Sequence, residues 1–237
     1  SAFRCRQMDG GAEHSAFRGA RVSRLWIIGN SGAARERFWI FKDMLAADAR
    51  LEQECRFGGF LSWGGYPSNL KELDSWFRGP VEAYAIDPED VFAIGVGAPR
   101  LRAAIYAAMK ERGADFFTLM PPPADVNPSA RIGEANIFQR SCSVFCDASI
   151  GHANYLNGAV NLAHDVVAGD ANFFGPFSLV LGNCRVGSRN QLAVHVALLP
   201  GSRIGDDNII APGSVVYKGC GHGRRMAGNP ALPMGEV

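Results

Sequence analysis

The sequence predicts a small α/β domain with a parallel sheet, followed by a parallel β-helix. The β-helix follows from a period of six residues, because sixteen consecutive positions six apart are apolar and the position four after each carries no formal charge. Helices repeat about every 3.6 residues and flat strands every second residue, so this period fits neither and indicates short strands separated by turns. The α/β domain follows from strand-like and helix-like segments that alternate before residue 120. The apolar positions are Val126, Ile132, Phe138, Val144, Ile150, Leu156, Leu162, Ala168, Phe174, Val180, Val186, Leu192, Leu198, Ile204, Ile210 and Val216.

Three such hexads would close one triangular coil, with the apolar side chains pointing into the prism. Small residues beside them would let the chain turn each corner. Residues three hexads apart would then lie above one another on neighbouring coils, roughly 4.8 Å apart. Ordinary sandwich strands are the alternative, but an unbroken phase over sixteen positions argues against them.

Length and composition exclude several classes of protein. The chain has 237 residues, 47% hydrophobic residues and a net charge of +1, so no strong field directs it to nucleic acid or to an anionic membrane. No apolar run approaches the ~20 residues of a membrane span, and no secretory pattern is present. The six cysteines form no Cys-x-x-Cys pair. We therefore expect a reduced, cytoplasmic setting, with Cys142, Cys184 and Cys220 as inert thiols in the small inward positions.

Four boundaries divide the chain. Residues 1–23 are polar and are expected to be poorly ordered. Residues 24–120 form the α/β domain, Rossmann-like in its opening, and the proline-rich residues 121–125 are a linker. The β-helix occupies 126–220, and 221–237 is a C-terminal tail. Within the α/β domain we predict strands at 24–29, 56–62, 91–96 and 115–120 and helices at 33–47 and 99–112.

The first strand runs into the turn Gly29-Asn30-Ser31-Gly32 and then into a helix. Glycines let the backbone approach a phosphate, and the first N–H groups of a helix are free to bind it. The full dinucleotide fingerprint is absent, so a tight turn without a ligand stays open as the alternative. The basic, glycine-rich end after residue 222 either contacts an anionic cofactor or caps the last coil.

One pair of residues in the repeats predicts chemistry. His164 lies two positions after Leu162, so it points outward near a corner, and Asp165 follows it. Gly182, three hexads later, should lie directly above His164 with an accessible N–H. A base beside such an N–H suits acyl transfer, because the base takes the proton of the nucleophile and the N–H stabilises the oxyanion. Asp165 would favour the charged imidazole. The alternative is a solvated surface histidine.

Other chemistry is not expected in the repeats. His152 lies two hexads before His164 and hence on another face, and His195 has Phe177 one coil below it and Gly213 one coil above. A zinc site needs about three clustered ligands, so we predict no metal. We place no cysteine or serine beside the base and therefore expect direct transfer without an acyl-enzyme.

These motifs together resemble the sialic acid O-acetyltransferase and nucleotide-sugar N-acetyltransferase family of the left-handed β-helix superfamily. The resemblance covers about residues 24–231 and is carried by the Ile-Ile-Gly-x-Ser-Gly turn, the hexads, Ala163-His164-Asp165 and the ending Ala227-Gly228-Asn229-Pro230-Ala231. It implies a left-handed coil, a homotrimer, acetyl-CoA bound between subunits, and a nucleotide-sugar or sialic-acid-like acceptor. It also implies a role in bacterial surface-polysaccharide or glycan biosynthesis.

The resemblance also implies roles for particular residues. His164 would be the general base, Asp165 its tuning partner and Gly182 the oxyanion donor. Acetyl-CoA would contact Phe173, Gly182, Val194 and Pro212, and the sugar nucleotide would contact Ser31, Gly32, Ala33, Ser62, Gly95 and Val96. The chain departs from the family at Ala33, where a histidine is common, at Ser62-Trp63, where paired aspartates are common, and at Phe173, where some members have histidine.

The sequence thus predicts an acetyl-CoA-dependent acetyltransferase that acts on an amino sugar, with a sialic-acid-like O-acetyltransferase as the alternative. Because of the substituted turn residues, a trimeric scaffold that binds a nucleotide without transferring an acyl group stays open. A zinc-dependent hydratase on the same prism is a third reading and would require bound metal.

Overall fold

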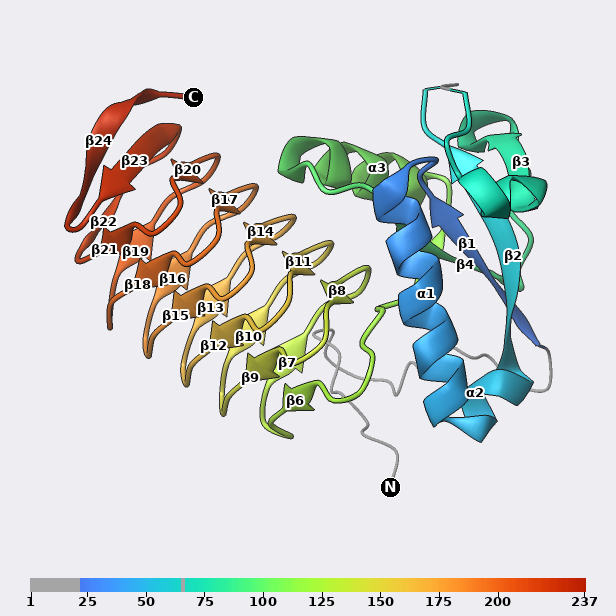
Figure 1. The fold of residues 1–237 in the computed structure, drawn as a ribbon, viewed down its shortest axis with the longest axis horizontal. Coiled ribbons are helices and arrows are strands. Elements are labelled where there is room, and N and C mark those ends of the chain that lie inside the picture. The colour runs from blue at the N-terminus through green and yellow to red at the C-terminus, as the bar shows by residue number, and fades with distance from the viewer. Residues whose placement is uncertain (1–21, 65–66) are drawn as a thin grey trace.

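The computed structural model describes residues 22–64 and 67–237. The predicted polar tail lies outside these residues, apart from Val22 and from Ser23, which already belongs to the first strand. The chain forms an α/β domain and an elongated prism of stacked coils, with helix α3 lying along both (Figure 1).

The α/β domain contains a five-stranded parallel sheet with the strand order β3-β2-β1-β4-β5. The predicted strands and helices are present, although the last predicted strand joins this sheet only at Asp115–Phe116, and its Leu119 forms a parallel bridge with Ile137 of the prism. Helix α2, two short 3₁₀ helices and β3 were not predicted. The elements are β1 (Ser23–Ile28), α1 (Gly32–Ala47), α2 (Ala49–Glu54), β2 (Cys55–Ser62), η1 (Lys71–Trp76), β3 (Phe77–Pro80), η2 (Val81–Ala83), β4 (Asp90–Ile94), α3 (Pro99–Glu111) and β5 (Asp115–Phe116).

Alternation along β1 sends its side chains into two cores. Leu25 and Ile27 pack on the side of α1, whereas Trp26 and Ile28 pack on the side of α3. Both faces of the sheet are therefore covered by helices, as a parallel sheet requires.

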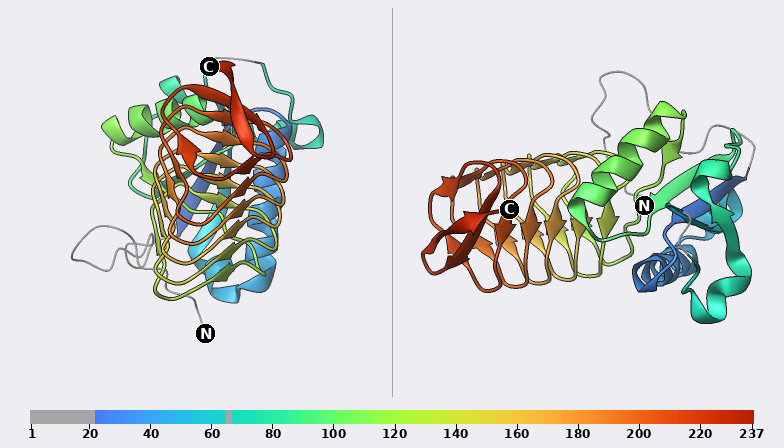
Figure 2. Two further views of the ribbon diagram at one scale, coloured as in Figure 1. Left: turned by 90° about the vertical axis from the view of Figure 1, so that its left-hand side faces the viewer. Right: turned by 90° about the horizontal axis from the view of Figure 1, so that it is seen from above.

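The repeats wind into a triangular prism with three faces of parallel two-residue strands, the predicted left-handed β-helix. Figure 2 shows the stacked coils along the prism and from its end. Face I contains β6 (Asp125–Val126), β9 (Ser143–Val144), β12 (Asn161–Leu162), β15 (Leu179–Val180), β18 (Ala197–Leu198) and β21 (Val215–Val216). Face II contains β7 (Arg131–Ile132), β10 (Ser149–Ile150), β13 (Val167–Ala168), β16 (Arg185–Val186), β19 (Arg203–Ile204) and β22 (Gly219–Cys220). Face III contains β8 (Ile137–Phe138), β11 (Tyr155–Leu156), β14 (Phe173–Phe174), β17 (Gln191–Leu192), β20 (Ile209–Ile210), β23 (Arg224–Gly228) and β24 (Ala231–Glu236).

The predicted register of three hexads per coil is confirmed, since Ile150 pairs with Ala168 and Leu162 with Val180. Every predicted apolar position except half-buried Val126 is buried in one continuous core. The inward thiols are part of it, and burial raises the pKa of Cys142 to about 11, which makes this thiol unreactive.

From Ala135 onward, the corners turn through left-handed backbone at the third position after each apolar residue. The non-glycine residues at this position have φ near +60°, as at Ala153, Asp165 and Phe177. At the edge between faces II and III, buried asparagines one coil apart bond to each other: Asn172 Oδ1 accepts from the N–H and the side-chain amide of Asn190. This ladder satisfies polar groups that would otherwise be buried without partners.

The end of the prism departs from the predicted tail. The last coil is shorter than the others, because Ile204 pairs with Cys220 and Ile210 with Met226. The chain then reverses, and β24 pairs antiparallel with β23. This hairpin occupies the open end of the prism, as expected for a capping element.

Face III joins the prism to the α/β domain. The outward side chains of Ile137 and Tyr155 belong to the same apolar core as α1, with half-buried Phe173 packed against it. Arg102 of α3 is fully buried and donates to the carbonyl oxygens of Ala153 at 2.7 Å and Asn154 at 3.0 Å. These contacts fix the domain on face III.

Candidate active site

His164 and Asp165 lie on the edge where face I turns into face II. The corner places Asp165 in left-handed backbone, with φ 59°, which short polar residues tolerate. Its Oδ2 lies 2.8 Å from His164 Nδ1. Because a carboxylate can only accept, this contact favours the tautomer with its proton on Nδ1, in which the lone pair of Nε2 is available as a base.

Gly182 lies directly above His164, as the register predicts. The backbone confirms the stacking, because Asn183 N donates to the His164 carbonyl at 3.1 Å. A Cβ at Gly182 would lie 2.5 Å from both Cε1 and Nε2 of His164, so the imidazole rests on the glycine Cα. Within residues 22–64 and 67–237, the Gly182 N–H donates to no protein acceptor. A base and a free N–H therefore lie side by side.

Cys146 corrects one expectation about this edge. It lies one coil below His164 and is exposed, and Asp165 N donates to its carbonyl at 3.1 Å. A thiol therefore does stand in the same column as the base, and counting back one coil from His164 would have found it. The imidazole leans toward Gly182, on the side away from this thiol.

The other residues predicted to contact acetyl-CoA do not meet His164 within one chain. Val194 and Pro212 lie exposed on the edge between faces III and I. Phe173 lies on face III, half-buried against Tyr155, with ring centroids 5.2 Å apart. In a triangular prism these positions belong to a different edge and a different face from the base.

The residues predicted to bind the sugar nucleotide do converge at the carboxyl ends of β1, β2 and β4. Gly29 N donates to Leu61 O and Gly95 N to Ile28 O, both at 2.7 Å. A Cβ on Gly29 would lie 2.8 Å from the Gly95 carbonyl oxygen, so the two turns touch. Carboxyl strand ends beside a helix N-terminus are where open α/β sheets bind ligands.

Side chains at this end leave polar atoms without partners. Ser31 precedes α1, and among the described residues its side chain makes no capping bond to the first N–H groups of the helix, which have no acceptor within the helix itself. Gly32 and Ala33 carry two of these groups. Ser62 is 1% exposed, and its Oγ has no partner among the described residues. The carbonyl of Val96 accepts from Arg102 at 3.0 Å, so this turn is tied to the arginine that anchors the prism.

The remaining described histidines have structural contacts. His152 Nδ1 accepts from Glu134 N at 3.1 Å, and His222 Nδ1 accepts from Asp206 N at 2.9 Å, both on the edge between faces II and III. The ring of His195 stacks on Phe177, as the register predicts. In the described part of the chain, no three His, Cys, Asp or Glu side chains gather as metal ligands would.

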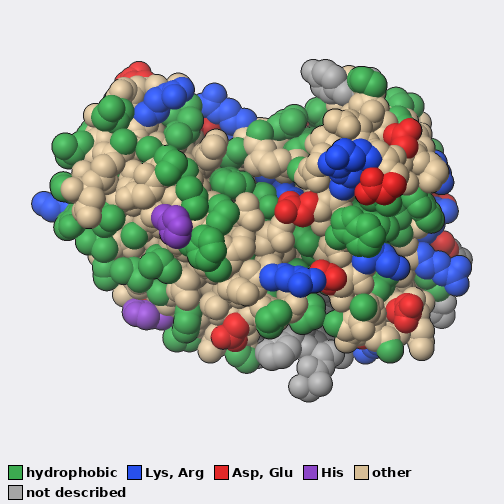
Figure 3. All heavy atoms as spheres, in the orientation of Figure 1, with side chains coloured by type: hydrophobic (Ala, Val, Ile, Leu, Met, Phe, Trp, Pro, Cys, Tyr) green, Lys and Arg blue, Asp and Glu red, His purple; other side chains and the backbone are tan. Residues whose placement is uncertain are grey.

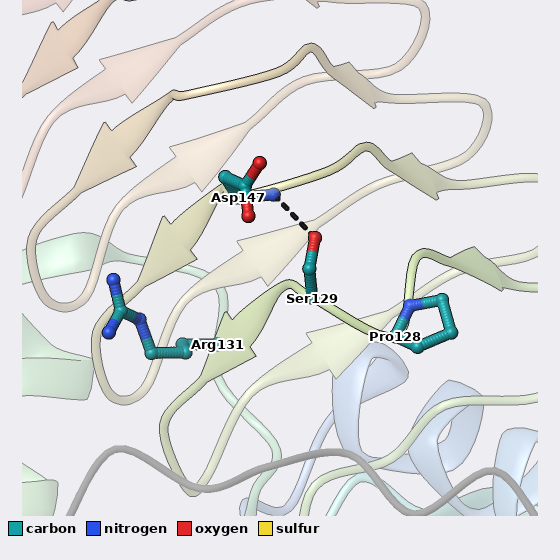
Figure 4. A pocket seen from close by; sticks show the side chains of 4 residues that line it. All are labelled: Pro128, Ser129, Arg131 and Asp147. Carbon is teal, nitrogen blue, oxygen red and sulfur yellow. Dashed lines mark hydrogen bonds between the residues drawn. The ribbon is translucent and has the colours of Figure 1, made fainter.

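A pocket lies at the first coil of the edge between faces I and II, in the column two coils below His164. Figure 4 shows Pro128, Ser129, Arg131 and Asp147 around it, with Asp147 N donating to Ser129 Oγ at 2.9 Å. Over the β-helix half of the molecule, Figure 3 shows many hydrophobic and few charged side chains. None of the helices within residues 22–64 and 67–237 combines the length and the apolar character needed to cross a membrane.

No family model and no curated protein matches the sequence. Solved structures do match. A variant of perosamine N-acetyltransferase from Caulobacter crescentus, in complex with CoA and GDP-perosamine, is 22% identical with a TM-score of 0.73, over 91% of this chain and 98% of that one. The acetyltransferase domain of PglB from Neisseria gonorrhoeae, in complex with acetyl coenzyme A, is 21% identical with a TM-score of 0.69, over 90% and 100%. WeeI from Acinetobacter baumannii is 20% identical with a TM-score of 0.64, over 90% and 100%. The likeness shows that these chains share one fold from the α/β domain through the prism.

Proposed function

We propose that the protein transfers the acetyl group of acetyl-CoA to an amine or hydroxyl of a nucleotide-linked sugar. The observation that carries the proposal is the contact of the His164 imidazole with Gly182, whose N–H has no acceptor among the described residues. Structures of the same fold that hold CoA with GDP-perosamine, or acetyl coenzyme A, support the choice of substrates.

In the proposed reaction the acceptor nitrogen or oxygen attacks the thioester carbonyl carbon. His164 Nε2 takes the acceptor's proton, while Asp165 holds the opposite ring nitrogen and stabilises the imidazolium. The Gly182 N–H donates to the carbonyl oxygen as it becomes negative. The C–S bond then breaks, the proton passes from the imidazolium to sulfur, and acetylated sugar and CoA leave. No residue is acylated.

In the proposed reaction, the edge that carries His164 needs a further surface to enclose the substrates. His164 and Asp165 have side chains 56% and 51% exposed on a convex corner of the prism. Ligand sites are concave and cover most of the ligand surface. Among the described residues, this corner therefore offers a base and a donor on a convex surface, and we propose that a neighbouring subunit completes the cleft.

Face I is the surface best suited to that neighbour. Exposed apolar residues run along it and its margins, including Phe145 at 45%, Leu179 at 44% and Tyr217 at 53% exposure. Face II instead carries exposed Arg185 and Arg203, and like charges would repel across a symmetric contact. Face III is covered by the α/β domain along its first coils. A second copy of this chain is thus the proposed occupant of face I.

Three copies with face I turned toward a common axis would form the predicted homotrimer. Each edge between faces I and II would then meet the neighbour's edge between faces III and I. This arrangement brings His164 of one subunit opposite Val194 and Pro212 of the partner subunit, which explains why one chain keeps them apart. The partner's α/β domain, on face III, would also present the acceptor to this base.

The test is release of free CoA from acetyl-CoA with a panel of UDP- and GDP-linked amino sugars. We expect His164→Ala to lower turnover by roughly 10² or more. Full activity in that variant would refute the mechanism, and the absence of transfer with every acceptor would favour a binding scaffold. The trimer is tested by the mass of the protein in solution.

A further inference from the structure

The edge between faces III and I carries two exposed, stacked rings. Phe177 is 55% exposed, and the His195 ring lies on it with centroids 5.1 Å apart and planes 11° apart. Phe177 has φ 59° and His195 φ 56°, a conformation that bulky side chains rarely adopt. The equivalent corners of the same edge hold the small residues Ser141, Ala159 and Gly213. A large ring held in this conformation and left exposed indicates that something packs against it.

The position of Phe177 along the prism is fixed by the register. It lies less than a third of a coil before Gly182, which is about 1.3 Å along the axis at about 4.8 Å per coil. Cyclic symmetry about an axis parallel to the prism leaves equivalent residues at equal heights. Phe177 of the partner subunit would therefore face the His164–Gly182 pair at its own level, and His195 of the partner subunit would lie one coil further along.

We infer that Phe177 of the partner subunit forms the far wall of the acyl pocket and limits the acyl group to acetyl. The inference rests on the proposed transfer reaction and on the trimer. The stacked imidazole of His195 holds the phenyl ring in place, so the wall is rigid. The thioester carbonyl would then lie between the Gly182 N–H and this ring, with space for a methyl group but not for a longer chain.

The first test is the acyl selectivity of Phe177→Ala. Alanine occupies the same left-handed corner position at Ala135, Ala153 and Ala171, so the substitution keeps the backbone. We expect the ratio of kcat/KM for butyryl-CoA to that for acetyl-CoA to rise about tenfold or more, the size expected for accommodating two methylene groups. Phe177→Leu should fall between wild type and Phe177→Ala. A ratio within twofold of wild type would overturn the inference.

Trp39→Ala is the matched control, because Trp39 is 54% exposed but lies on α1, away from this edge. Its selectivity should equal that of wild type. Suppose that wild type and this control transfer acetyl in a His164-dependent manner, and that Phe177→Ala has the same acyl selectivity as wild type. The assignment of Phe177 as the wall is then wrong, and the proposed function stands. If wild type transfers nothing, the proposed function fails instead.

Mixed trimers test which subunit supplies the wall. A tagged Phe177→Ala chain is produced with an excess of untagged His164→Ala chain and purified through the tag. His164 is then present only in the tagged chain, and its neighbour in most trimers is an untagged chain that still has Phe177. If the neighbour supplies the wall, selectivity for acetyl-CoA should return. Retained tolerance of butyryl-CoA would place base and wall in the same chain and overturn the assignment.

A proximity test needs no activity. In a background with Cys5 and Cys146 replaced by serine, His164→Cys and Phe177→Cys are combined in one chain and treated with a short dimaleimide. Covalent dimers and trimers on a denaturing gel are expected. Only monomers, from protein whose solution mass is that of a trimer, would show that the two edges do not meet.

Discussion

The Gly182→Ala variant tests the catalytic geometry most directly. An ideal Cβ at this position lies 2.5 Å from Cε1 and Nε2 of His164, whereas ordinary contacts are 3.4–4 Å. The imidazole must therefore move by about 1 Å, and a displacement of about that size can cost about 10² in rate. The variant keeps the Gly182 N–H, so the loss would report the displaced base alone. The upper limit is the whole general-base contribution, about 10²–10⁴.

The same substitution leaves the fold intact. Gly182 has no left-handed φ, and a glycine-to-alanine change at such a site tends to stabilise by about 0.4–1 kcal/mol through the unfolded state. We expect an unchanged or slightly higher thermal midpoint together with the lowered turnover. Gly221→Ala is the control, because a Cβ there meets nothing within 4 Å.

Initial rates of CoA release from acetyl-CoA and the best acceptor measure the effect. The double variant with His164→Ala should be no slower than the His164→Ala single variant, since both changes remove one base. Turnover of Gly182→Ala within threefold of wild type would show that the imidazole does not act from the position in which it is found.

Three further variants test the remaining parts of the description. Cys146→Ser should keep kcat/KM within about threefold of wild type, because direct transfer uses no thiol. Loss of turnover in this variant, together with a trapped acyl-enzyme of increased mass in wild type, would favour a covalent route. Asn172→Ala should lower the free energy of unfolding by about 3 kcal/mol. It leaves the amides of Asn190 and other ladder groups buried without an acceptor, at a cost of about 1–3 kcal/mol each. Asn127→Ala is the control, because Asn127 is exposed and its replacement should change the urea midpoint little. Leu179→Glu should convert the proposed trimer to monomers in light scattering and abolish transfer, and an unchanged solution mass would exclude face I as the interface.

The period of six predicted the prism because the fold repeats one local geometry. Each hexad places one apolar side chain inward, and backbone pairing between coils then fixes every residue above its equivalent in the preceding coil. The same rule placed Gly182 over His164 and Phe177 under His195. Counting 18 residues back from His164 by the same rule also reaches Cys146.

Features without this repetition were harder to predict. The segment before β4 contains α2, two 3₁₀ helices and β3, whose short lengths give no clear period. The hairpin of β23 and β24 follows a shortened coil and so has left the hexad phase. The left-handed corners were also hard to predict, because most of them hold Ala, Asp, Asn or even Phe177 in place of the glycine that usually marks such a conformation.

No local sequence pattern predicts how the turns after β1, β2 and β4 lie relative to His164. Face III, which holds the α/β domain, lies opposite the edge that holds His164 in a triangular prism. An acceptor bound at the carboxyl ends of β1, β2 and β4 therefore lies on the far side of the prism from the base of its own chain. In the proposed trimer, a neighbouring chain would bring a second α/β domain to that base. The acceptor domain and the base would then act in different subunits, and assembly becomes a condition for catalysis rather than an addition to it.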